Sequence, residues 1–167
     1  MKRILHVGCG GEHLPPWLDG EEIRLDLDPA AEPDIVASMT DMGPIGPYDA
    51  VYSSHSVEHL YPHEVPWALG EFLRVLKPGG AAIIIVPDLE DAKPTDEVLY
   101  VSPGGPIAGF DLFYGHRASV QANPYMAHHT GFVASTLRKA LKQAGFQSIQ
   151  IDRQSGWNLL ALGLKAP

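Results

Sequence analysis

The strongest constraint on the fold is a strand–helix–strand pattern in the middle of the chain. Residues 48–53 (YDAVYS) read as a strand, and residues 62–76 repeat apolar side chains at the spacing of one helical face. The segment Lys77-Pro78-Gly79-Gly80 ends that helix, and residues 81–86 (AAIIIV) form the longest apolar run in the sequence. A continuous apolar run of this length is typical of a strand that is buried on both faces of a parallel sheet. The pattern therefore predicts an α/β fold with a mainly parallel sheet.

The same criteria extend the predicted sheet in both directions. We expect five further strands at Arg3–Val7, Ile23–Leu27, Asp34–Ser38, Ser148–Arg153 and Asn158–Lys165, and a second helix at Ser135–Ala144. The last two strands are joined by a turn, which predicts an antiparallel hairpin at one edge. Residues 88–131 show no clear period and are rich in Pro, Gly, His and aromatic residues, so we expect an irregular lid or substrate segment there. With 167 residues in all, residues 1–167 have the length of a single domain.

Charge and composition exclude several classes of protein. The formal net charge is −8 and no segment concentrates Lys and Arg, so we expect no nucleic-acid partner. The longest apolar run is far shorter than the roughly 18 residues that cross a bilayer, so we expect no membrane association. The first residues contain too few apolar side chains for a signal peptide. A single cysteine leaves no intrachain disulfide, and together these features predict a cytoplasmic protein.

Chemically useful residues follow the predicted strands at the points where they end. Gly8-Cys9-Gly10-Gly11 follows the first strand, and Asp26 lies at the end of the second. Ligands of open parallel sheets bind beyond the carboxyl ends of the strands. Glycines let a backbone approach a ligand closely, and a carboxylate can accept hydrogen bonds from both ribose hydroxyls. The pattern predicts a cofactor that contains a nucleoside.

A dinucleotide is a poor candidate for that cofactor. The G-x-G-x-x-G fingerprint needs a third glycine at the position of His13, followed by a helix that faces the pyrophosphate. Pro15-Pro16 lies where this helix would run. A cofactor without phosphates fits the sequence better.

Four segments, taken in order, carry a family resemblance: residues 5–11 (LHVGCGG), 24–29 (RLDLDP), 48–60 (YDAVYSSHSVEHL) and 72–89 (FLRVLKPGGAAIIIVPDL). Together they resemble the motifs of class I S-adenosylmethionine-dependent methyltransferases, in particular the type-11-like branch. The resemblance covers residues 3–89 well and the chain from Ala134 more loosely. It implies a Rossmann-like, mostly parallel seven-stranded sheet with strand order 3-2-1-4-5-7-6 and an antiparallel last strand.

The resemblance also implies S-adenosylmethionine as cofactor and assigns the residues that bind it. These are Gly8 and Gly10 at the methionine part, Asp26 at the ribose, Ser38 and Met39 at the adenine, and Ser54 and His55 after the fourth strand, with Leu27 as a further cofactor-binding residue. Two residues depart from the family pattern. His6 stands where the family usually has Asp or a small polar residue, and Ser38 stands where an Asp often contacts the adenine. These departures leave open a non-catalytic cofactor-binding or interaction protein.

The links between the first three strands are unusually short. Parallel crossovers through a helix need a dozen or more residues, so the helices between strands 1 and 3 should be reduced or missing. A parallel sheet needs cover on both faces, so one face should be partly bare near these strands. We expect Trp17, with Leu14 and Leu18, to cover part of that face, and a second copy of the chain, forming a homodimer, to cover the rest.

A zinc hydrolase is a further alternative. Residues 55–59 (HSVEH) match H-x-x-E-H, a signature in which two histidines bind zinc and the glutamate acts as base. That function requires one continuous helix through these residues and a third ligand. The competing interpretation is that Glu58 and His59 brace the segment after the fourth strand, and on it we expect no resident metal.

We therefore expect a methyltransferase that acts on a small-molecule or saccharide-like acceptor by in-line methyl transfer. Such a reaction mainly needs alignment of donor and acceptor and exclusion of water. A hydroxyl or amine acceptor must also lose a proton. His116 and His129, in and beside the irregular segment, are the candidate general bases, since an imidazole titrates near neutral pH.

Overall fold

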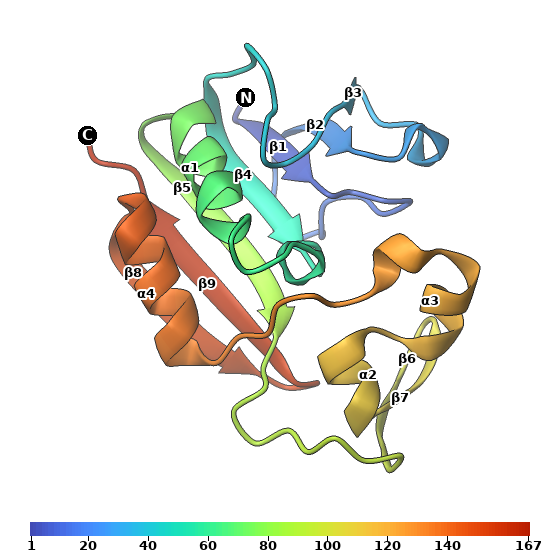
Figure 1. Ribbon diagram of the computed structural model, residues 1–167. Helices are drawn as coiled ribbons and strands as arrows, with labels where there is room; N and C mark the ends of the chain where they lie inside the picture. The colour runs from blue at the N-terminus through green and yellow to red at the C-terminus, as the bar shows by residue number, and fades with distance from the viewer.

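The computed structural model describes all 167 residues and contains a seven-stranded sheet (Figure 1). Its strand order is β3-β2-β1-β4-β5-β9-β8. The strands are β1 (Arg3–Val7), β2 (Glu21–Asp26), β3 (Ile35–Val36), β4 (Tyr48–Ser54), β5 (Leu76–Pro87), β8 (Gln147–Gln154) and β9 (Asn158–Leu164). All neighbours pair in parallel except β9, which is antiparallel to both β5 and β8. This confirms the predicted α/β fold, its strand order and its antiparallel last strand.

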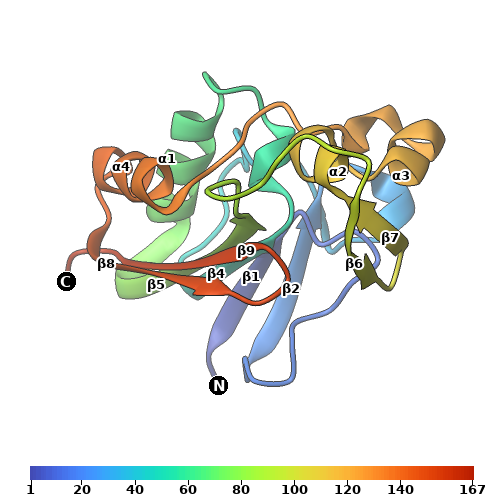
Figure 2. The ribbon, with the colours of Figure 1, turned by 90° about the horizontal axis from the view of Figure 1, so that it is seen from below.

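Both long helices cover the same face of the sheet. Figure 2 shows α1 (Val65–Val75) and α4 (Ala134–Ala144) side by side on one side of the strands. Phe72 of α1 and Leu141 of α4 are completely buried there, together with Ile84 of β5. The helical face predicted from the sequence is thus the face that forms the main core. No helix of the structure has the length and apolar character that crossing a lipid bilayer requires.

The crossovers from β1 to β3 contain no α-helix, as the short links predicted. Only a 3₁₀ turn at Pro29–Ala31 lies between β2 and β3. The loop between β1 and β2 is held by Glu22 instead. The Oε1 atom of Glu22 accepts the backbone N–H of Leu14 at 3.0 Å and lies 2.8 Å from Nδ1 of His6, while Oε2 lies 2.8 Å from Nδ1 of His13. One carboxylate therefore fixes the loop that takes the place of a crossover helix.

That loop covers only part of the second face of the sheet. Leu14 and Leu18 pack on a small cluster around Ile4 and Tyr52, and the Trp17 ring lies edge-on to Tyr52 with ring centroids 6.1 Å apart. Leu14, Trp17 and Leu18 therefore cover part of this face, as the sequence predicts.

The apolar part of the second face that lacks helical cover lies farther along the sheet than expected. It runs over β5 and β9, where Ile83, Ile85 and Leu160 are only half-buried. Near the first strands, β2 instead presents Glu22 and Arg24, whose polar groups tolerate water. The uncovered apolar surface is therefore central in the sheet and not at strands 1–3.

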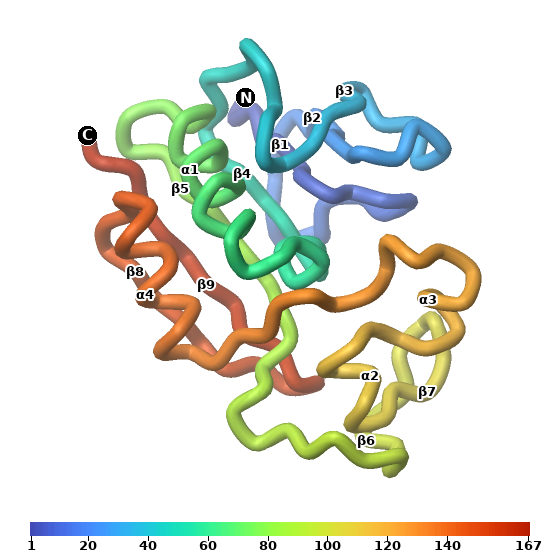
Figure 3. The backbone as a smooth tube through the Cα atoms, viewed as in Figure 1, coloured from blue at the N-terminus to red at the C-terminus, as the bar shows by residue number.

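Residues 88–131 form a small lobe beside the carboxyl end of the sheet (Figures 1 and 3). The lobe contains a hairpin, β6 (Val98–Ser102) with β7 (Gly105–Ala108), the helices α2 (Gly109–Tyr114) and α3 (Arg117–Ala122), and a 3₁₀ turn at Pro124–Met126. The buried Asp111 organises it, because its carboxylate accepts the backbone N–H of Ala108 at 2.7 Å and pairs with Arg117. Elements of four to six residues are too short to show a period, so the sequence predicts an irregular segment where short elements exist.

The buried His6 should make the protein sensitive to acid. Burial lowers its pKa below the ordinary 6.5, although the Glu22 carboxylate acts in the opposite direction. The unfolded chain then binds the proton more tightly, so the free energy of unfolding should fall as the pH falls through 6.5. The slope is at most about 1.4 kcal/mol per pH unit for one proton. Urea denaturation between pH 7.5 and 5.5 should show a shallower slope for His6→Gln than for the wild type.

The exposed His63 supplies the matched control for this measurement. His63→Gln should keep the wild-type slope, because it removes an imidazole that folding does not bury. An unchanged slope in His6→Gln would contradict the assignment.

Candidate functional site

The glycine loop after β1 is packed against the loop after β4. Gly8 has a φ of +66°, and a Cβ atom added there would lie 2.3 Å from Oγ of Ser56. The Ser56 hydroxyl donates to the Gly8 carbonyl at 3.0 Å. On the other side, the backbone N–H of Gly8 donates to the carbonyl of Leu25 at 2.8 Å. Only glycine fits this position, because the conformation is left-handed and the neighbouring loop leaves no room for a side chain.

Asp26 closes the other side of the same loop. Its Oδ2 atom accepts the backbone N–H of Gly10 at 2.7 Å, and its Oδ1 atom accepts the N–H of Asp28 at 2.9 Å. Each carboxylate oxygen can accept a second donor, so two acceptor positions remain. A Cβ atom on Gly10 would meet nothing within 4 Å, so the space beside this backbone is open. The register of β1 on β2, with Val7 opposite Leu25, is what brings the two strand ends together.

The other predicted cofactor residues lie around this loop in different ways. Leu27 is 61% exposed directly after Asp26. The Met39 methyl group lies 3.6 Å from where a Cβ of Gly8 would stand, so this side chain lines the glycine loop. The Ser38 hydroxyl lies 2.7 Å from the hydroxyl of Thr40 and accepts its backbone N–H, so it serves its own turn.

Ser54 is the last residue of β4, and His55 directly follows it. His55 donates its backbone N–H to the carbonyl of Ile85 at 2.9 Å, and its φ of +50° is uncommon for a residue with a side chain. Backbone strain of this kind gathers at functional sites. The structure thus brings Gly8, Gly10, Asp26 and Met39 into one cradle, with the end of β4 beside it.

Two residues that hold this cradle, Arg24 and Ser56, lie inside the motifs quoted above, but the sequence assigned them no role. Arg24 donates from its guanidinium to the Gly10 carbonyl at 2.5 Å and to the Ala31 carbonyl at 3.2 Å. Ser56 anchors Gly8 from the loop after β4. For Arg24, the sequence offers one indication of a structural role, namely an arginine inside a short parallel strand. The role of Ser56 depends on a contact with Gly8, which lies 48 positions away in the sequence.

The two candidate bases lie in different places. The exposed His129 stacks on Tyr61 with ring centroids 4.3 Å apart, and its backbone N–H donates to the Glu58 carbonyl at 2.9 Å. His116 lies at the start of α3 in the lobe, with Nδ1 2.9 Å from the Ser119 hydroxyl. His129 is therefore held against the loop after β4, and His116 is held within the lobe.

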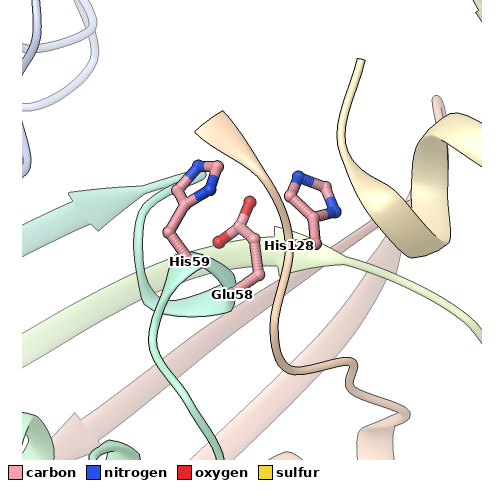
Figure 4. Close-up of side chains that lie close together, drawn as sticks. All are labelled: Glu58, His59 and His128. Carbon is pink, nitrogen blue, oxygen red and sulfur yellow. The ribbon is translucent and has the colours of Figure 1, made fainter. Parts of the chain in front are cut away.

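The helix that the H-x-x-E-H interpretation requires is absent. His55 has a left-handed conformation, and only a 3₁₀ turn at Val57–His59 follows it. The motif histidines therefore do not project from successive turns of one helix, and the zinc-hydrolase alternative is wrong in this respect. The side chains of Glu58 and His59 instead point toward His128, a residue of the lobe (Figure 4).

Comparison with known proteins identifies the family. The sequence family described as "Methyltransferase domain" matches residues 1–151. No curated protein gives a significant match.

Solved structures share the fold at low sequence identity. An S-adenosylmethionine-dependent methyltransferase from Mesorhizobium loti is 18% identical with a TM-score of 0.66, over 98% of this chain and 91% of that one. The 1,6-didemethyltoxoflavin-N1-methyltransferase from Burkholderia thailandensis is 14% identical with a TM-score of 0.65, over 99% of this chain and 72% of that one. The methyltransferase SibL is 16% identical with a TM-score of 0.65, and this chain covers only 51% of its length.

The family match, the strand order and the cradle at the ends of β1 and β2 agree with one another. They are also consistent with the type-11-like branch that the sequence motifs resemble. The chain belongs to the methyltransferase-domain family, and its fold is that of the S-adenosylmethionine-dependent methyltransferases described above.

Proposed function

We propose that this enzyme transfers the methyl group of S-adenosylmethionine to a small-molecule or saccharide-like acceptor by in-line displacement. The observation that carries the proposal is the contact between Gly10 and Asp26, which leaves two free acceptor positions beside an open stretch of backbone. The Burkholderia relative, named for a small-molecule substrate, supports an acceptor of that class.

The residues of the cradle fit the proposed cofactor. The two ribose hydroxyls are donors, and Asp26 offers one remaining acceptor position on each oxygen. Leu27 and Met39 supply apolar surface for the adenine. When bound, the cofactor supplies an electrophilic methyl group. The chain contributes alignment of the two reactants and exclusion of water.

The proposed site keeps the remaining assignments made from the sequence. Ser38 would lie at the adenine, and Ser54 and His55 would line the cofactor after β4. We infer that a base takes the acceptor's proton, with His129 and His116 as the candidates. His129 is better placed for this role, because its contacts fix it at the carboxyl edge of the sheet.

Replacing Asp26 by asparagine should weaken cofactor binding about 10- to 100-fold, because a hydrogen bond to a charged group contributes about 1.5–3 kcal/mol. Isothermal calorimetry with S-adenosylmethionine and its demethylated product measures this directly. Asp19→Asn is the control, since it removes the same charge from an exposed loop carboxylate that lies outside the cradle.

Absence of binding to the wild type at millimolar ligand would reject the proposed function. Binding without methyl transfer in a broad screen of acceptors would instead favour the non-catalytic alternative.

We also infer that a second copy of the chain covers the open face of the sheet. β5 and β9 are apolar on both faces, a pattern typical of strands that are buried on both sides. The flanking β8 presents Gln150 and Asp152 on its second face and so gives the patch a polar rim. The single cysteine, Cys9, is buried and unpaired, which suits the reducing cytoplasm that we propose as its compartment.

A further inference from the structure

The carboxylate of Glu58 is buried without a hydrogen-bond partner. The side chain is 1% exposed, and neither Oε1 nor Oε2 has a partner within hydrogen-bond geometry. The nearest basic atom, Nδ1 of His55, lies 3.4 Å from Oε1, which is too long for a strong hydrogen bond. Burying an unpaired carboxylate is strongly unfavourable, so the native protein must compensate this charge.

Two imidazoles converge on this carboxylate. His59 follows Glu58 in the 3₁₀ turn after β4, and His128 comes from the end of the lobe (Figure 4). One ligand atom from each of the three side chains lies within 4.8 Å of the other two. The rings of His59 and His128 meet edge to face with centroids 5.1 Å apart.

The hydrogen bond that the His128 ring makes through Nδ1 leaves Nε2 free to bind an ion. Its Nδ1 lies 3.0 Å from the carbonyl of Leu112, which can only accept, so Nδ1 carries the proton. Nε2 then keeps its lone pair. Metal-bound histidines are held in this way, with one ring N–H donated to a carbonyl or carboxylate and the other nitrogen on the ion.

His59 has a conflict that a cation would resolve. Its Nδ1 lies 3.1 Å from the Ala127 carbonyl, and its Nε2 lies 3.1 Å from the His55 carbonyl. A neutral imidazole has one N–H, so one of its nitrogens must direct a lone pair at a carbonyl oxygen. A metal ion bound at one of these nitrogens would accept that lone pair and leave the other nitrogen to donate to its carbonyl.

We propose that Glu58, His59 and His128 form a binding site for one divalent transition-metal ion. Two imidazoles and one carboxylate are a ligand set typical of Zn²⁺, with a fourth position left for water or another ligand. Zinc–ligand distances of about 2.0–2.2 Å require ligand atoms roughly 3.4 Å apart, so binding would draw the three side chains together by small rotations.

The proposed site differs from the zinc-hydrolase signature in the same segment. Glu58 is a ligand here and not a base, and the second imidazole comes from a residue 70 positions away in the sequence. The ion would join the lobe to the sheet. The backbone already approaches at this point, since the N–H groups of His129 and Thr130 donate to the Glu58 carbonyl at 2.9 and 3.0 Å. The proposal is independent of the acceptor and of the proposed base.

The test is metal binding by protein that carries no His-tag and has been stripped with a chelator. Titration with Co²⁺ should produce the visible absorption of a tetrahedral site with a stoichiometry of one per chain, and Zn²⁺ should displace it. Zn²⁺ should also raise the melting temperature of the wild type. His128→Gln and Glu58→Gln should each weaken Zn²⁺ binding by at least about 100-fold and remove the shift in melting temperature.

His63→Gln is the control, because His63 is exposed, lies four residues beyond His59 and stacks on Tyr61 outside the cluster. It should bind like the wild type. His128→Gln keeps the test decisive if Glu58→Gln fails to fold, since His128 is only partly buried. Wild-type protein that binds no Co²⁺, or a His128→Gln variant that binds with wild-type affinity, would overturn the proposal. Cofactor binding, measured separately by calorimetry, distinguishes that outcome from a failure of the proposed function.

Discussion

Gly8→Ala is expected to lower cofactor affinity more than 100-fold and to destabilise the protein by about 3 kcal/mol. The left-handed backbone at φ +66° disfavours alanine by about 1–2 kcal/mol. Forcing a side chain into packed surroundings adds about 1–3 kcal/mol, and here the new Cβ would stand 2.3 Å from Oγ and 2.6 Å from Cβ of Ser56. The loop can relieve this overlap only by moving away from the loop after β4, which would displace Gly10 from Asp26. Calorimetry and urea denaturation measure the two effects.

Gly79→Ala is the control that separates the effect of backbone strain from that of steric overlap. Gly79 has a similar φ of +74°, but a Cβ there would meet nothing within 4 Å. This variant should be destabilised by only about 1–2 kcal/mol and should bind the cofactor normally. Wild-type affinity in Gly8→Ala would mean that the glycine loop does not form the cofactor cradle.

The fold could be predicted from the sequence where elements are long and regular. The apolar period of residues 62–76 contains α1, and the run at 81–86 lies inside β5. The missing crossover helices could also be predicted, because Pro15-Pro16 and the short links leave no room for them. Strand order, by contrast, came from the resemblance to a family and not from any single pattern.

The site was less predictable because its contacts join distant residues. Gly8, Gly10 and Asp26 follow the strands directly, so their position at the carboxyl edge follows from topology. The convergence of Glu58 with His128 depends instead on how the lobe folds back onto the loop after β4. The sequence predicts His129 as a candidate base, but it does not indicate that the adjacent His128 points toward Glu58.

The uncovered apolar surface of the sheet is a second feature that the sequence predicts only in part. An apolar run such as AAIIIV predicts a strand buried on both faces, but it does not say what covers each face. In the structure, α1 and α4 cover one face of β5, and the loop with Trp17 reaches only part of the other. Side chains that alternate along β5 therefore differ in their surroundings although their chemistry is the same.

Ile84→Ala and Ile83→Ala test this asymmetry with adjacent residues of one strand. Ile84 is completely buried under the helices, so its truncation should cost about 3–4 kcal/mol of unfolding free energy from lost burial and a residual cavity. Ile83 is half-buried on the open face, where water can fill the space, and its truncation should cost about 1 kcal/mol in the monomer. Urea denaturation at low protein concentration measures both.

Protein concentration then reports on the proposed second copy. If a second copy covers the open face, light scattering should show a dimer at high concentration, and the effect of Ile83→Ala should grow with concentration while that of Ile84→Ala stays constant. A chain that remains monomeric at high concentration would contradict the dimer. It would not contradict a sheet that helices cover on one face only, which we call the one-sided sheet. Equal losses for the two variants in the monomer would instead contradict the one-sided sheet, because truncations of the same side chain differ in cost only when their surroundings differ.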